Sequence, residues 1–141
     1  MRLELSKRTD LALRAMESLN HGSHITSGAE LAEAIGTSTN YLPQVMKPLI
    51  ENKWVAGTPG PGGGYRLRAS LRSVSVLDVV EAVEGPTEQG RCVLRGAPCP
   101  AQEQCALHTS WIKGRAALLA ELGVLSLQEA LLVPPGDRPA V

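Results

Sequence analysis

Two short apolar-periodic segments that flank a glycine constrain the fold of this chain more than any other feature. Residues 28 to 35 and residues 39 to 52 carry apolar side chains at helical spacing, and Gly36 breaks the pattern between them. Ser38 or Thr39 can cap the second helix, because a hydroxyl accepts a hydrogen bond from a first-turn amide. Two short helices joined by a tight turn are typical of the helix-turn-helix, whose second helix lies in the major groove of DNA.

The segments around this helix pair extend the pattern. Residues 6 to 20 repeat apolar side chains at helical spacing, which predicts a first helix with one buried face. Within the second helix of the pair, Pro43 is tolerated near the first turn, whereas Pro48 cannot donate to the carbonyl four residues back. We therefore expect a kink or an early end of that helix at Pro48.

The stretch KWVAGTPGPGGGYRLR predicts a β-hairpin directly after the helix pair. Strands are expected at residues 54 to 56 and 64 to 68, with a glycine-rich tip between them. Such a wing can press its backbone against DNA, since glycine lets the chain approach closely. A nucleotide-binding loop needs Lys followed by Ser or Thr after its last glycine, whereas Tyr65 and Arg66 follow here. The expected fold is mainly α with a small β-hairpin, a winged helix-turn-helix.

All three cysteines lie in one polar segment, GRCVLRGAPCPAQEQCALH, at Cys92, Cys99 and Cys105. No window of about 18 consecutive apolar residues occurs, and the charged start MRLELSKRTD lacks the apolar run of a secretory signal, so we expect a cytoplasmic protein. Thiols stay reduced there, and an odd number of cysteines argues against a disulfide framework. Gly96 and Pro98 allow the segment to curl, so the three thiolates can converge on an iron-sulfur cluster or zinc.

The charge distribution is uneven although the formal net charge is zero, from 14 basic and 14 acidic residues. Residues 1 to 72 hold nine Lys/Arg and six Asp/Glu, and residues 73 to 141 hold five and eight. This asymmetry permits nucleic-acid contact by the first half without requiring it. Catalysis is not expected, because the chain has no C-x-x-C pair, and His21 and His24 lie in a turn with no nearby thiol.

The residues after Cys105 predict a long helix that ends near Gly123. Its apolar face is longer than the remaining core needs, so we expect a partner helix to cover the excess. The alternative is that this helix folds back on its own domain. The apolar face consists of Leu107, Trp111, Ala116, Leu118, Leu119 and Leu122.

Five stretches occur in the order seen in a known family: RTDLALRAMESL, TNYLPQVMKPLIENKWV, GPGGGYRL, SVLDVVEAVEG and the cysteine segment. Over about residues 1 to 132, the chain resembles the bacterial winged-helix regulators typified by IscR, NsrR and RirA. The resemblance implies a homodimeric transcription factor that binds double-stranded operator DNA. It also implies an iron-sulfur cluster held by three cysteines just before a long dimerisation helix.

The resemblance offers two candidates for the fourth ligand of such a cluster. His108 lies one helical turn after Cys105 and matches the histidine of IscR-like members, which hold 2Fe-2S clusters. Asp10 lies in an N-terminus that closely matches the NsrR type, in which an aspartate reaches the cluster from the opposite subunit and the centre resembles 4Fe-4S proteins. That match favours Asp10 slightly. The alternatives are a surface histidine and a helix N-terminal charge favoured by the helix dipole.

DNA contacts are expected from the second helix of the pair and from the wing. Asn and Gln suit base recognition, because an amide pairs with adenine in bidentate fashion. Two positions depart from the family pattern: Pro59 stands where IscR-like wings carry an arginine, and Pro43 replaces an acidic residue that some recognition helices use. Arg66 and Arg68 can contact phosphates or instead cap the hairpin. The expected contact residues are Ser38, Thr39, Asn40, Tyr41, Gln44, Lys47, Gly60, Pro61, Arg66 and Arg68.

These patterns together predict three regions: a DNA-binding domain over residues 1 to 72, a cluster-binding segment with the dimerisation helix over 73 to 132, and a disordered tail over 133 to 141. We expect a repressor whose operator affinity is controlled by an iron-sulfur cluster that senses nitric oxide, redox state or iron-sulfur supply. The alternative is a winged-helix regulator that holds zinc or senses thiol oxidation without an iron-sulfur cluster.

Overall fold

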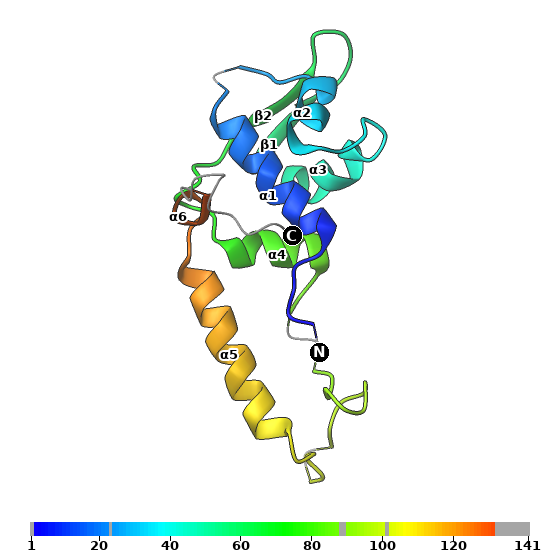
Figure 1. The fold of residues 1–141 in the computed structure, drawn as a ribbon, viewed down its shortest axis with the longest axis vertical. Coiled ribbons are helices and arrows are strands. Elements are labelled where there is room, and N and C mark those ends of the chain that lie inside the picture. Colours follow the sequence, from blue (N-terminus) through cyan, green and yellow to red (C-terminus); the bar gives the residue numbers. More distant parts are fainter. Residues whose placement is uncertain (1, 23, 88–89, 101, 132–141) are drawn as a thin grey trace.

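The computed structural model describes residues 2–22, 24–87, 90–100 and 102–131. A unit of helices and one hairpin lies at one end, and a long helix leads away from it toward the segment that carries the cysteines (Figure 1). The tail expected over residues 133 to 141 lies outside the described residues. The elements are α1 (Lys7–Asn20), α2 (Gly28–Ile35), α3 (Leu42–Glu51), β1 (Val55–Thr58), β2 (Gly64–Leu67), α4 (Val76–Glu84), α5 (His108–Val124) and α6 (Leu127–Leu131).

Side-chain caps fix where the first two helices begin. The Ser6 hydroxyl accepts a hydrogen bond from the Thr9 amide at the start of α1, at 3.2 Å. Ser27 and Glu30 form a reciprocal capping box at the start of α2. Gly36 ends α2 with a φ of 77°, a left-handed conformation that glycine adopts without steric cost. The expected helices over residues 6 to 20 and 28 to 35 are therefore confirmed.

The second helix of the pair begins later than expected. α3 starts at Leu42, and residues 39 to 41 form a turn, so the expected start at Thr39 is wrong. Pro43 explains the delay, because it has no amide to donate to the carbonyl of Thr39. The Ser38 hydroxyl accepts from the amide of Tyr41 at 3.1 Å, so it caps the turn rather than the helix.

Of the two effects considered at Pro48, a kink or an early end of the helix, the early end is wrong. α3 continues past Pro48 to Glu51, and the amide of Asn52 still donates to the Pro48 carbonyl at 3.1 Å. A proline inside a helix removes one hydrogen bond, and its ring also crowds the carbonyl four residues back. Val45, Met46 and Leu49 are fully buried, and their packing holds α3 in place across that gap.

The wing is a two-stranded antiparallel hairpin whose strands are shifted slightly from the expected positions. β1 pairs with β2 in a register that places Val55 opposite Leu67. A third segment joins it, because Thr26 and Tyr65 exchange backbone hydrogen bonds of 2.9 and 2.8 Å. Gly64 is required at this junction, since a Cβ there would lie 2.1 Å from the carbonyl oxygen of Thr26. The strand β2 is thus fastened to the chain that enters α2.

The hydrophobic core lies among α1, α2, α3 and α4. Ala12 and Ala15 are fully buried, which lets neighbouring helices approach α1 closely. The other buried apolar residues of this core are Leu11, Met16, Leu19, Leu31, Ala32, Ile35, Leu42, Val45, Met46, Leu49, Val55, Leu71, Val74, Val76, Val79, Val80, Val83 and Leu127.

The long helix α5 is fastened to this unit through its C-terminal end. None of the residues of α5 is buried, but Leu127, which starts α6, is fully buried in the core. Backbone hydrogen bonds support the junction: Leu127 donates to the Val74 carbonyl at 2.8 Å, and Val76 donates to that of Leu125 at 2.9 Å. The expected helix end near Gly123 is confirmed to within one residue, at Val124. Within the described part of the chain, no helix is long and apolar enough to cross a lipid bilayer.

Candidate metal centre and nucleic-acid interface

The three cysteines converge in the segment between α4 and α5. Their sulfur atoms all lie within 4.8 Å of one another, and the Sγ atoms of Cys92 and Cys105 are 3.5 Å apart. A tight turn brings them together, because the Cys92 amide donates to the Ala97 carbonyl at 2.9 Å and the Gly96 amide donates to the Cys92 carbonyl at 3.0 Å. Gly96 has a φ of 67° in this turn, so the curling expected from its position is present.

The surroundings of the thiols lower the pKa of Cys92 and raise that of Cys99. The neighbouring Cys99 thiol and the backbone amides of Leu94 and Arg95 donate to Cys92 and lower its pKa to about 7. The amide of Cys105 favours the thiolate of Cys99, but the thiols of Cys92 and Cys105 and partial burial outweigh it and raise the pKa of Cys99. Cys92 is therefore the thiol that ionises most readily of these two.

One face of α5 forms the wall of the pocket that holds the three thiols. His108, Trp111, Ile112 and Arg115 line it, spaced so that they fall on one side of the helix. His108 lines the pocket, but its ring nitrogens do not belong to the group of candidate ligand atoms that lie within 4.8 Å of one another. Trp111 was expected on a dimer face, and no role was predicted for Ile112 and Arg115. Their spacing from His108 is the signal that could have identified them.

Asp10 lies on α1 and does not line this pocket within its own chain. Its carboxylate forms ion pairs with Lys7 at 3.2 Å and Arg14 at 3.1 Å. Partial burial acts to raise the pKa of Asp10, but the hydrogen bonds and charges of Arg14 and Lys7 outweigh it and lower the pKa. Asp10 is thus a carboxylate that stays ionised, held at the first turn of its helix.

The residues expected to contact DNA divide between the turn before α3, the exposed side of α3 and the wing. Asn40 lies in the turn and is exposed, while Tyr41 is half-buried against the core at the start of α3. Gln44 and Lys47 are exposed on α3, and Lys47 pairs loosely with Glu51 at 3.8 Å. The remaining expected contacts are also exposed, and they are Ser38, Thr39, Gly60, Pro61, Arg66 and Arg68.

The apolar face expected on α5 is divided among different surroundings. Leu122 packs against the core, and Leu119 lines a cavity of about 470 Å³ that Leu77 of α4 also lines. Leu118 also lines this cavity but remains 46% exposed, and Ala116 is exposed. The helix therefore folds back in part on its own unit, and a portion of its apolar surface stays uncovered.

Comparison with known proteins identifies the family of this fold. The family model of Rrf2, described as an iron-dependent transcriptional regulator, matches residues 5–131. The chain belongs to the Rrf2 family. It is 32% identical over 111 residues to the HTH-type transcriptional regulator IscR of Cronobacter sakazakii, a match that covers 77% of this chain and 68% of that one. It is 36% identical over 83 residues to IscR of Vibrio campbellii, covering 59% and 49%.

Solved structures agree with this membership. CymR, the global cysteine regulator of B. subtilis, superimposes on this Rrf2 protein with a TM-score of 0.73 at 26% identity, covering 92% of this chain and 96% of that one. T. potens IscR shares the fold, with a TM-score of 0.70 at 22% identity over 99% and 93%. The expected winged-helix class and the resemblance to IscR-type regulators are confirmed. The protein is a transcriptional regulator and not an enzyme.

Proposed function

We propose that this Rrf2 protein is a cytoplasmic, homodimeric repressor whose affinity for operator DNA is set by an iron-sulfur cluster on Cys92, Cys99 and Cys105. The observation that carries the proposal is the convergence of all three thiol sulfurs within 4.8 Å in one pocket. Nitric oxide, redox state or iron-sulfur supply is the signal that such a cluster would report.

The donor set fits an iron-sulfur group. Thiolates are soft ligands that favour iron-sulfur clusters or zinc over hard cations. The Leu94 amide donates to the Sγ of Cys92 at 3.4 Å, and hydrogen bonds of this kind to sulfur tune a bound cluster. Arg91 and Arg115 line the same pocket, and their positive charges offset the negative charge of three thiolates. When bound, the cluster would supply a centre that exchanges electrons and reacts with small molecules.

The fourth ligand is proposed from the same two residues as before. His108 lies in the wall of the thiol pocket and offers a neutral nitrogen from the same subunit. Asp10 of the partner subunit offers an anionic oxygen, and its ionised state suits that role. An oxygen ligand is the weaker partner for iron in a thiolate-rich site and the easier one to displace.

The cluster would act on DNA through the position of α5. Ligation fixes the cysteine segment at the N-terminal end of α5, while Leu127 fastens the other end to the core. In a dimer built on α5, this fixes the spacing of the two α3 helices, which must match the spacing of two operator half-sites. The cluster can change operator affinity only if the protein with the cluster and the protein without it bind DNA with different affinities.

An anaerobic preparation of the full chain tests the proposal. We expect brown protein with visible absorbance and matching iron and sulfide contents. Asp10→Ala and His108→Ala are compared with it, and the variant of the true ligand should show a shifted or labile spectrum while the other looks native. Colourless protein with stoichiometric zinc contradicts the iron-sulfur proposal. Native spectra from both variants contradict both ligand assignments.

A second candidate function is thiol-oxidation sensing without an iron-sulfur cluster. The 3.5 Å separation of the Cys92 and Cys105 sulfurs favours it, because two thiols this close can be joined without a large movement. This candidate predicts a metal-free protein whose DNA affinity changes on treatment with peroxide and returns with a thiol reductant.

A further inference from the structure

The start of α1 is joined to the end of α4 by a compact set of hydrogen bonds. Among the described residues, Thr9 is the one polar residue that is buried, with 0% of its surface exposed. Its hydroxyl donates to Glu84 Oε1 and lies 3.0 Å from the hydroxyl of Ser6. The amide of Ser6 donates to the same Glu84 oxygen at 2.7 Å, and the Arg8 guanidinium donates to the Val83 carbonyl.

The contact with the start of α1 explains why a carboxylate lies at the end of α4. A carboxylate at the C-terminal end of its own helix is disfavoured by the helix dipole. Glu84 is the last residue of α4, yet its carboxylate is aimed at the first turn of α1, where free amides and the dipole favour an anion. Thr9 and Glu84 are 75 positions apart in the sequence, so their hydrogen bond joins distant parts of the chain.

Glu84 is also the point from which the cysteine segment leaves the folded unit. Gly85 follows with a φ of 88°, and the amide of Thr87 is held by the Glu81 carboxylate at 3.4 Å. Residues 90 and 91 already line the thiol pocket. Glu84 also lines the cavity that Leu118 and Leu119 of α5 line, and the N-terminal part of α5 lines the thiol pocket. The helix α5 therefore lies against both the thiol pocket and the surroundings of Glu84.

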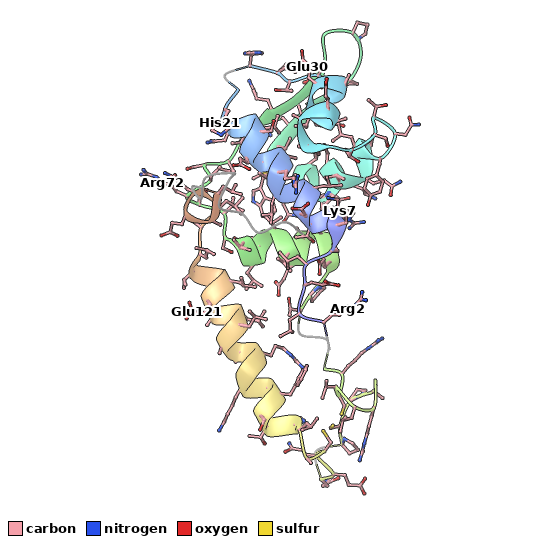
Figure 2. The ribbon with its side chains drawn as sticks, in the orientation of Figure 1. Arg2, Lys7, His21, Glu30, Arg72 and Glu121 are labelled. Carbon is pink, nitrogen blue, oxygen red and sulfur yellow. The ribbon has the colours of Figure 1, made fainter. Side chains whose placement is uncertain are left out.

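On its other side, α1 packs directly against α3. The buried residues of α1 and α3 belong to one core, with Ala12, Ala15 and Met46 fully buried. Protein interiors of this kind are close-packed and transmit strain, so a displacement of α1 acts on the α3 side chains packed against it. Figure 2 shows Lys7 at this start of α1 beside α4, and Arg2 in the arm that leads from it toward the cysteine end of the molecule.

We propose that Thr9 and Glu84 are positioning residues that transmit the ligation state of the three cysteines to α3 and so to operator DNA. This inference rests on the proposed function. The path runs from the thiol pocket to Glu84, from Glu84 to Thr9 and Ser6, and from α1 through the shared core to α3. The side chains of Thr9 and Glu84 contact neither the thiols nor the residues expected to contact DNA. Substitutions at these two positions therefore test the path itself.

The experiment measures operator affinity in the cluster-loaded and cluster-free states of the full chain. The probe is a DNA duplex selected from a random-sequence library with the loaded wild-type protein. Thr9→Val removes the hydroxyl at nearly constant volume, and Glu84→Gln removes the charge. Thr9→Ser keeps the hydroxyl. Glu121→Gln is the matched control, because Glu121 lies on α5 away from this contact (Figure 2).

We expect both Thr9→Val and Glu84→Gln to reduce the ratio of loaded to empty affinities by about fivefold or more, the lower range of allosteric coupling. Iron content and the visible spectrum should stay native, and Thr9→Ser and Glu121→Gln should keep the wild-type ratio. Hydrogen exchange of α3 amides should respond to cluster loading in the wild type and lose that response in Thr9→Val. A role in stability alone would lower the melting temperature and leave both the ratio and the exchange response unchanged.

The outcomes separate this inference from the proposed function. Wild-type protein that binds the duplex equally in both states overturns the proposed function, and the inference falls with it. Wild-type protein that responds to ligation, together with Thr9→Val and Glu84→Gln variants that keep the full response, overturns the inference alone. Glu84→Gln decides the question if Thr9→Val does not fold, because Glu84 is exposed and its replacement leaves the core intact.

Discussion

At the scale of single residues, the side chains at the start of α3, on α3 and on the wing should differ in how they contribute to DNA binding. Tyr41→Ala and Gln44→Ala should weaken binding to the operator and leave the dimer and the visible spectrum intact, because side chains at base edges carry sequence information. Arg66→Ala and Arg68→Ala should weaken specific and non-specific binding alike, and each should reduce the salt dependence by about one unit of slope. Affinity measured at several salt concentrations distinguishes the two classes. Unchanged operator affinity in the Tyr41 and Gln44 variants would remove α3 from the groove.

At the scale of elements, the contact between α1 and α4 should make stability depend on pH through Glu84. Partial burial acts to raise the pKa of Glu84, but hydrogen bonds from Thr9 and Ser6 and the charge of Arg8 outweigh it and hold the pKa below its ordinary 4.5. The folded state therefore binds this proton more weakly than the unfolded state does. The stabilisation is complete above the unfolded pKa and is lost as the pH falls through the lower folded value.

Urea unfolding at several pH values checks this dependence. Glu84 is exposed and solvent screens its interactions, so Glu84→Gln should lower the free energy of unfolding at pH 7 by less than about 1 kcal/mol. The variant should also show a shallower fall in stability on the acid side than the wild type, with parallel curves at neutral pH and above. A Glu84→Gln curve with the wild-type acid slope would mean that the carboxylate gains nothing from Ser6 and Thr9 in solution.

At the scale of the whole molecule, the uncovered apolar surface of α5 should hold two chains together. Ile112 and Leu118 are 45% and 46% exposed, and single helices that project from a small unit usually cover such surface with a partner. Sedimentation should give twice the chain mass of 14.9 kDa. Leu118→Glu should shift the protein toward monomer, because it places a charge in an apolar interface, and should weaken operator binding. Glu121→Gln should remain dimeric, and a wild-type monomer at micromolar concentration would contradict the dimer.

Local signals in the sequence were sufficient for much of this molecule. The helix pair around Gly36, the hairpin with its glycine tip and the helix that follows Cys105 depend on periodicity, turn residues and breakers within a few positions of one another. The curl of the cysteine segment belongs to the same class, since Gly96 takes the left-handed conformation that its turn needs. The start of α3 was misjudged because the absent amide of Pro43 outweighed the capping ability of Ser38 and Thr39.

Only the tertiary structure decided how these pieces meet. Thr9 reads in the sequence as an ordinary polar residue near a helix start, and its burial depends on Glu84, 75 positions away. In the sequence, nothing distinguishes Leu127 from the other leucines near the long helix. In the structure it is fully buried in the core and anchors the C-terminal end of α5 there. Helical spacing groups Ile112 and Arg115 with His108, but only the folded chain shows that this side of α5 lines the thiol pocket while Leu119 and Leu122 lie toward α4 and the core. Periodicity shows that a helix has an apolar side, but which partner covers that side depends on packing between segments far apart in the chain, and no local pattern encodes it.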